Sequence, residues 1–426
     1  MSTTDTGTRT ITDTEAATGT ETTTGTEKIT GTETASGTET TTGTETITLT
    51  EGALGPYVTH TPTRRWLTGP GLPADSGLLT FEVLRTDGLR TVADHTGDPA
   101  RLPVDLREQL VIGALRDPVA AETESVLLDG ATGEVSTTCF LHDRPDLMER
   151  RPFAPSLQTL AGFMTATEEM SARSGRFASY EGRFGPKAVT GMSRRLLTEF
   201  EAGVDGEVPP FWKMAALIRP LALVAGPPED SALTLDLPAR LLDQEFGQGR
   251  VVRYEDVDFP VALAHEPTRR FLRETGLPED GFLFQLDTDV PLPTLTEYYE
   301  DERPDVLTAD QLPDGADHLI RLGHLVEDNS LVVDGATGAI LDWSEPEATL
   351  HALNTDVSTL AFTLWLLHRE RTIDESLSHE LTAGAYDQLA TTMTQTLSAV
   401  DPTGSTPLGE WHYWTEMFQD EAAGVL

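Results

Sequence analysis

The sequence predicts an α+β protein that consists of two tandem copies of one domain after a disordered N-terminal tail. Two observations predict the copies: short motifs recur at a displacement of 205 residues, and in each copy strand-like apolar patterns precede helical ones. A third observation predicts the tail, because residues 1–50 are almost half threonine. A short helix, an antiparallel meander and C-terminal helices on one face form an α+β unit.

The tail at residues 1–50 has a six-residue period, with Gly-Thr-Glu starting at positions 19, 25, 31, 37 and 43. A solenoid with this period needs an aliphatic residue in each turn to fill its axis. Isoleucine occurs only at positions 11, 29 and 47 of this stretch. The segment therefore cannot bury enough apolar surface to offset the entropy of ordering it, and we expect it to be disordered.

The duplication rests on three motifs in a single register. They are His-x-Pro-Thr-Arg-Arg-[Trp/Phe]-Leu at 60–67 and 265–272, Gly-Leu-Pro at 71–73 and 276–278, and Asp-Gly-Ala-Thr-Gly at 129–133 and 334–338. We therefore place the first copy at 51–225, a linker at 226–257 and the second copy at 258–426. Part of the linker, around 233–259, is expected to pack on the second copy.

The first half of each copy reads as a short helix followed by strands. Proline at the start and Gly-Leu-Pro at the end bracket helices at 61–69 and 266–275. Alternating or continuous apolar residues predict strands next. These strands are 78–84, 282–287, 318–326, and two hairpins closed by Asp-Gly-Ala-Thr-Gly, whose aspartate and glycines suit a tight turn.

The second half of each copy reads as helices. Residues 157–170 and 357–369 are apolar on several sides and are expected in the core. Residues 187–200 and 379–400 are amphipathic, with apolar residues at three- and four-residue spacing. A tryptophan-bearing helix closes each copy, at about 209–223 and about 408–423.

The composition excludes several classes of partner. The chain has 30 basic and 70 acidic residues, a formal net charge of −40, which disfavours binding to nucleic-acid phosphates and to anionic membranes. Residues 251–426 hold 34 acidic and 8 basic residues, so most of the negative charge lies there. No apolar run suits a membrane span or a signal peptide, so we expect a cytoplasmic protein.

Motifs for catalysis, cofactors and metals are not found. The chain has no Walker A, Gly-x-Gly-x-x-Gly, Gly-x-Ser-x-Gly or His-Glu-x-x-His sequence. His142-Asp143 lacks the further histidines of a metal site, and Cys139, the single cysteine, is expected to be a buried, inert thiol. We therefore predict no cofactor, no metal and no catalytic residue.

One stretch suggests a protein-binding surface. Two tyrosines adjoin a dense acidic run between two predicted strands, and this pattern suits recognition of a basic protein. The candidate partner-binding residues are Tyr298, Tyr299, Glu300, Asp301, Glu302 and Asp305. The alternative interpretation is a solvated loop.

The duplicated motifs resemble the SUKH superfamily of bacterial immunity proteins, specifically its fourth group. The resemblance rests on the arginine-containing helix followed by Gly-Leu-Pro, on Leu322-Gly-His-Leu325, on Asn329-Ser-Leu-Val-Val-Asp-Gly335 and on the closing Trp414 helix. It covers the second copy nearly end to end. The first copy diverges in its middle and has Glu124 where the second has Asn329.

This resemblance implies a non-enzymatic α+β protein that binds and neutralises a polymorphic toxin, often a nuclease or deaminase. An acidic inhibitor would be steered towards a toxin with a basic surface, and we expect the more acidic second copy to contact it. Two alternatives remain: a regulatory or scaffold protein that bridges two partners through its duplicated domains, and an enzyme that uses His318, His324 and nearby carboxylates.

Overall fold

The computed structural model describes residues 45–116, 124–228, 232–281, 284–308, 311–326, 329–377, 386–405 and 412–423. Both copies and the segment that joins them belong to one compact unit, Thr44–Leu426. Most of the expected disordered tail, residues 1–44, lies outside the described residues. Its last residues belong to the first copy, because β1 (Thr46–Ile47) pairs with β2 (Leu72–Pro73) and Ile47 is buried.

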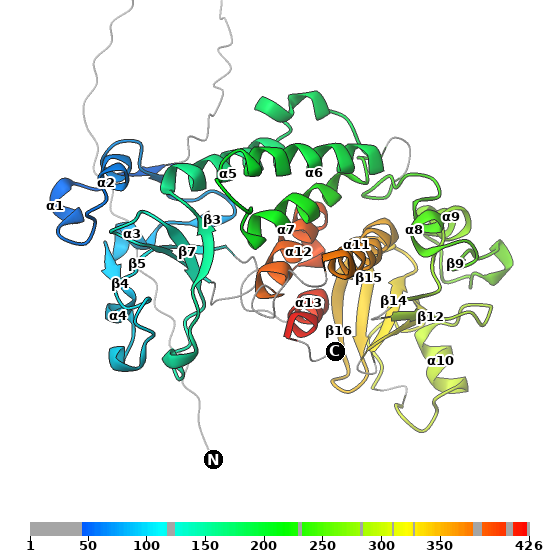
Figure 1. Ribbon diagram of the computed structural model, residues 1–426. Helices are drawn as coiled ribbons and strands as arrows, with labels where there is room; N and C mark the ends of the chain where they lie inside the picture. Colours follow the sequence, from blue (N-terminus) through cyan, green and yellow to red (C-terminus); the bar gives the residue numbers. More distant parts are fainter. Residues whose placement is uncertain are drawn as a thin grey trace, which may run out of the picture. The chain divides into compact units, whose positions relative to one another are not determined.

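The first copy starts with two short helices and continues as an antiparallel sheet (Figure 1). The helices are α1 (Glu51–Leu54) and α2 (Thr61–Thr68). The sheet runs in the order β3 (Leu79–Thr80), β5 (Leu110–Leu115), β6 (Ser125–Leu128), β7 (Val135–Thr138) and β8 (Arg151–Ala154), and β4 (Arg90–Thr91) also pairs with β5. Between β3 and β5 lie the one-turn helices α3 (Val83–Thr86) and α4 (Val92–His95).

The second copy repeats this plan. Helix α9 (Glu266–Glu274) precedes a sheet in the order β11 (Asp280–Gly281), β12 (Phe284–Leu286), β13 (Leu319–Leu325), β14 (Asn329–Asp334), β15 (Ile340–Ser344) and β16 (Thr349–Asn354). Helix α10 (Leu295–Asp301) stands between β12 and β13, as α4 stands between β3 and β5. Both sheets are antiparallel meanders, as the sequence predicts.

Both predicted hairpins form with the same turn. Asp129 Oδ1 accepts hydrogen bonds from the backbone N–H groups of residues 131 and 132, at 2.8 and 2.9 Å. Asp334 Oδ1 repeats these contacts at the same distances. The closing glycines have φ of 84° and 81°, a conformation that other residues rarely adopt. The motif is therefore a structural turn in each copy.

Three helices follow each sheet and cover one of its faces. They are α5 (Leu157–Ser171), α6 (Pro186–Glu201) and α7 (Pro210–Ile218) in the first copy, and α11 (Val357–Leu377), α12 (Tyr386–Val400) and α13 (Tyr413–Ala423) in the second. A 3-10 segment, η4 (Arg219–Leu223), extends α7. Trp212 Nε1 donates to the carbonyl of Phe153 at 2.9 Å, and the equivalent Trp414 donates to Asn354 at 2.9 Å. The closing tryptophans are thus core residues that join the last helix to the last strand.

The segment that joins the copies packs into the core of the second one. It contains α8 (Leu241–Phe246) and β9 (Val251–Val252), which pairs with β10 (Leu277–Pro278). Its apolar residues Leu233, Leu241 and Leu242 are buried in the same cluster as the second sheet. Much of the region predicted as a linker is therefore integral to the second copy, as was expected for its later part.

Helix α12 of the second copy also packs against the first copy, where it contacts α7 and η4. Its Gln388 donates to the carboxylate of Glu124 at 2.6 Å, and its Gln395 donates to the carbonyl of Arg116 at 2.5 Å. Arg219 of η4 in turn donates to Gln395 at 2.8 Å. The two copies therefore contact each other directly through polar side chains, in addition to being joined by the linker.

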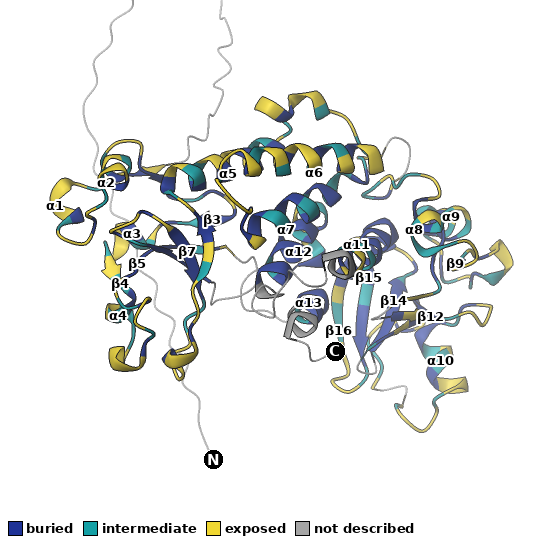
Figure 2. Cartoon of the chain, viewed as in Figure 1, coloured by how far each residue is buried: buried dark blue, intermediate teal, exposed yellow. Residues whose placement is uncertain are grey.

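Some predicted elements differ in the structure. The strand expected at 78–84 is only two residues long, because the chain turns into α3 straight after Phe81. The acidic run expected between two strands begins on a helix, α10, whose N-cap Thr294 forms a capping box with Glu297. Strands β8 and β16 were not predicted. In Figure 2 the central strands of both sheets are buried along their length, whereas β8 and β16 are edge strands with partly exposed residues.

Candidate partner-binding site

Each sheet has a second face, opposite the three helices, which a short helix and neighbouring loop residues cover. Neighbouring residues on a strand point to opposite faces, so Val111 and Leu127 form a small cluster apart from the main core of the first copy. In the second copy Val332 and Trp343 form the matching cluster beneath α10.

The short helices α4 and α10 occupy equivalent places on this face. Thr91 pairs with Leu110 beside α4, and Thr294 pairs with Ile320 beside α10. Both threonines are N-caps with a capping box. Counting along each helix from its cap makes His95 the counterpart of Tyr298.

The two predicted tyrosines lie in different environments. Tyr299 is buried: its hydroxyl donates to Glu345 at 2.9 Å and accepts from the indole N–H of Trp343 at 3.1 Å. Burial raises the pKa of Tyr299 above its usual value. Tyr299 therefore anchors α10 to the sheet and does not reach the surface. Tyr298 is half-buried, and the guanidinium of Arg321 lies 4.0 Å from the centre of its ring.

The predicted acidic residues do reach the surface. Glu300, Asp301, Glu302 and Asp305 are exposed, and none of them forms an ion pair within the described part of the chain. The arginine among them, Arg303, is held by Glu345 at 3.0 Å. We call these four carboxylates the acidic patch. Their charge is not compensated locally, so it is available to attract a basic surface.

Beside the acidic patch, Arg321 fills the space between β12, β13 and α10. Its side chain is only 7% exposed and forms an ion pair with Asp287. Its Nε donates to the hydroxyl of Ser330 at 3.3 Å, and its guanidinium stacks on Tyr298. An arginine that is buried in this way is stabilised by the charge partner and the aromatic face together.

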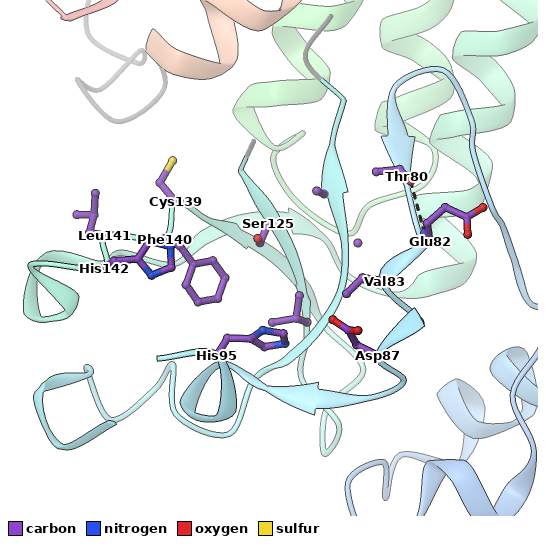
Figure 3. A pocket seen from close by; sticks show the side chains of 13 residues that line it. Thr80, Glu82, Val83, Asp87, His95, Ser125, Cys139, Phe140, Leu141 and His142 are labelled. Carbon is purple, nitrogen blue, oxygen red and sulfur yellow. Dashed lines mark hydrogen bonds between the residues drawn. The ribbon is translucent and has the colours of Figure 1, made fainter. Parts of the chain in front are cut away.

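At the equivalent place the first copy has a cavity of about 550 Å³, within the range of ~300–1,000 Å³ common for ligand sites. Figure 3 shows His95, Asp87, Ser125 and Phe140 around it. The ring of Phe140 lies 6.0 Å from that of His95 and 6.1 Å from that of His142. The lining therefore combines the acidic residues Glu82 and Asp87 with a group of neighbouring aromatic rings.

The charge of this cavity is negative. Its lining residues include Glu82 and Asp87 and no lysine or arginine, and in Figure 3 the carboxylate of Glu82 points away from His95 and Phe140. Glu82 faces Arg85 at 3.5 Å in an exposed pair, whereas Asp87 forms no ion pair within the described residues. His95 Nε2 is buried and has no hydrogen-bond partner among these residues. Cys139, expected to be a buried thiol, is half-buried at the edge of the cavity.

The residues considered for catalysis or metal binding do not gather into a site. His324 is exposed on β13, and the side chain of His318 is 68% exposed beside Asp317. Neither histidine lines the cavity. The part of the chain that the structure describes contains no group of three metal-binding side chains. It also has no helix with the length and apolar character needed to span a membrane.

Fold and surface together define a class of protein: a tandem α+β domain pair whose exposed acidic groups suit contact with another protein. Comparison with known families is consistent with this class. The SUKH-4 immunity protein family matches residues 25–202 and 237–420. The chain therefore belongs to the SUKH-4 immunity protein family, with one match over each copy. Searches of curated proteins and of solved structures returned no match.

Sequence reasoning found the acidic patch but missed the cavity. The motif displacement of 205 residues does not hold on β5 and β13, where the displacement is 210: Val111 pairs with Leu127, and Arg321 pairs with Val332. Each of these strands has a β-bulge, which is followed by Gly113 in β5 and by Gly323 in β13. These two glycines are also 210 residues apart and therefore identify the changed displacement. Aligning these glycines would have paired Val111 with Arg321 and revealed the missing arginine.

Proposed function

We propose that this protein is a cytoplasmic immunity protein that binds a cognate polymorphic toxin, a nuclease or deaminase, and neutralises it without a chemical step. The observation that carries the proposal is the SUKH-4 family match, which extends over both copies. The uncompensated acidic patch supports it, since toxins that act on nucleic acids need basic surfaces to hold phosphates.

In this proposal the second copy makes the first contact. The acidic patch extends from the C-terminal end of α10, and residues 251–426 hold most of the negative charge of the chain. Such a field speeds the encounter with a basic protein and loses strength as salt screens it. The buried contact of α12 with the first copy would hold both copies in place during binding.

The test is co-expression of the full chain with the toxin encoded beside its gene. The proposal expects the cells to survive, the two proteins to copurify at equal stoichiometry, and toxin activity to be lost in the complex. The proposal would be refuted if every toxin encoded by a neighbouring gene failed to bind the full chain and killed the cells despite its presence. A complex that holds two different proteins at once would instead favour a bridging scaffold.

A further inference from the structure

We propose that the cavity of the first copy receives an arginine side chain from the protein partner. The second copy shows what this space holds when it is filled: its own Arg321, which contacts Asp287, Ser330 and Tyr298. The first copy has Val111 in place of this arginine, and it keeps groups that can bind one. The inference rests on the proposed function, because it treats the toxin as the source of the side chain.

The strand registers establish the equivalence of the two sites. Val111 pairs with Leu127, and Arg321 pairs with Val332, which lies 205 residues after Leu127. Both residues precede the bulge glycine of their strand. Val111 is therefore the residue of the first copy that stands where Arg321 stands in the second.

The groups that hold Arg321 have counterparts in the first cavity. On the neighbouring strand Ser125 pairs with Ala114 as Ser330 pairs with His324, so the two serines occupy the same position. Ser125 lines the cavity. The hydroxyl that accepts a hydrogen bond from Arg321 in the second copy is therefore retained in the first.

A carboxylate and a ring are present here as well. Thr80 pairs with Ala114 and Gln285 with His324, so Glu82 and Asp287 each come two residues after an equivalent position. At Glu82, however, the chain has already turned into α3, and the carboxylate faces Arg85 at 3.5 Å. Asp87 adds a second carboxylate, which Figure 3 shows beside His95. His95 occupies the position of Tyr298, so a flat ring is present on which a guanidinium can stack.

An arginine fits this site better than other basic or neutral groups. A planar guanidinium donates several hydrogen bonds in fixed directions and stacks on rings, whereas a lysine ammonium does neither in the same way. The carboxylate of Asp87, which forms no ion pair within the described residues, favours a cation, and the lining contains no lysine or arginine. The cavity of about 550 Å³ leaves room for a side chain that enters from outside.

The test fills the cavity from within and measures the affinity of the full chain for the toxin. Val111→Arg places in the first copy the residue that the second copy already has, so it should compete with the incoming side chain. Asp87→Asn removes one charge without adding bulk and serves if the larger substitution prevents folding. The matched control is Val261→Arg, the same change at a residue that is 98% exposed in the second copy.

We expect Val111→Arg to raise the Kd for the toxin about tenfold or more and Asp87→Asn to raise it several-fold, as when one partner of a close charge pair is lost. The Kd of Val261→Arg for the toxin should stay within about twofold of that of the unchanged chain, because this substitution adds a charge at an exposed position outside the cavity. A toxin that binds all four proteins equally would overturn the cavity proposal and leave the proposed function standing.

A second measurement tests the cavity without the toxin. The full chain is labelled with ¹³C at histidine Cε1 and titrated with N-acetyl-arginine amide, with the neutral citrulline analogue as a control. The resonances of His95 and His142 are assigned from His95→Gln and His142→Gln. The proposal expects both to shift at about millimolar arginine analogue, the affinity of a weak single-group ligand, and not with citrulline. If no toxin binds the full chain, the proposed function fails. If neither histidine resonance moves, the cavity proposal fails, and each result is obtained independently of the other.

Discussion

Replacing Asp342 with asparagine should remove a large part of the pH dependence of folding stability. Asp342 lies on β15, is fully buried, and one of its carboxylate oxygens has no hydrogen-bond partner. Its nearest polar contact is the amide of Asn329, at 3.5 Å. Burial, together with the negative charge of Glu347, raises the pKa of Asp342 from 3.8 to about 7.

The sign and size of the effect follow from this pKa. Well below pH 3.8 the carboxyl is protonated in both the folded and the unfolded chain. As the pH rises towards 7, only the unfolded chain loses the proton, so the folded state loses stability. A pKa that moves from 3.8 to about 7 corresponds to about 4 kcal/mol at ~1.4 kcal/mol per pH unit. Asparagine cannot ionise and should not show this loss.

The assay is urea unfolding at several pH values, with the free energy of unfolding compared between the unchanged chain and Asp342→Asn. Other titrating groups are common to both proteins and cancel in the difference. We expect Asp342→Asn to gain up to about 4 kcal/mol relative to the unchanged chain between pH 4 and 7, and no more above pH 7. Asp301→Asn, at an exposed position, is the control. A difference that is equal at pH 4 and pH 8 would refute this reasoning.

Three further substitutions test the fold. Gln388→Ala leaves a buried carboxylate short of one donor and should destabilise the chain by about 1–3 kcal/mol in urea unfolding, whereas the exposed control Gln244→Ala should not. Gly335→Ala puts a Cβ 2.1 Å from a backbone carbonyl and should cost about 1–3 kcal/mol or prevent folding, while Gly97→Ala has open space and should be neutral. Arg321→Val removes the ion pair with Asp287 from a buried site and should lower the midpoint of thermal unfolding. An unchanged midpoint would contradict the expectation that Arg321 stabilises the fold.

The duplication made much of the fold predictable from sequence. Most elements could be read twice, so the hairpin turn at 129–133 was supported by 334–338, and the helices after it were placed in both copies, although β5, the counterpart of the strand at 318–326, was not predicted. The structure agrees on an α+β architecture with an antiparallel meander followed by helices. Strands β8 and β16 were missed because neither shows a regular alternation of apolar and polar residues.

The candidate site was predictable only in part. Exposed carboxylates can be seen in a sequence, and the structure places the acidic patch on the surface. Burial of a neighbouring tyrosine cannot be seen, because it depends on Glu345 and Trp343, which lie more than forty residues further along the chain. The cavity was missed because the 205-residue displacement of the motifs does not align Val111 with Arg321, whereas the displacement of 210 on these strands does.

The two copies differ at the place that Arg321 occupies in the second one. In the second copy Arg321 closes the site and supports α10, from whose end the acidic patch extends. In the first copy the same place is open and lined by Glu82 and Asp87. The copies thus differ at this place: the second has a buried arginine, and the first has an open cavity.

The most direct test of the central claim measures the association of the full chain with its toxin at about 0.05 M and about 0.5 M salt, where screening differs strongly. We predict tight binding whose association rate falls with salt, and a slower, less salt-dependent rate for Glu300→Gln, Asp301→Asn and Glu302→Gln combined. An association rate that is independent of salt and unchanged in the triple variant would contradict the claim that the acidic patch attracts a basic partner.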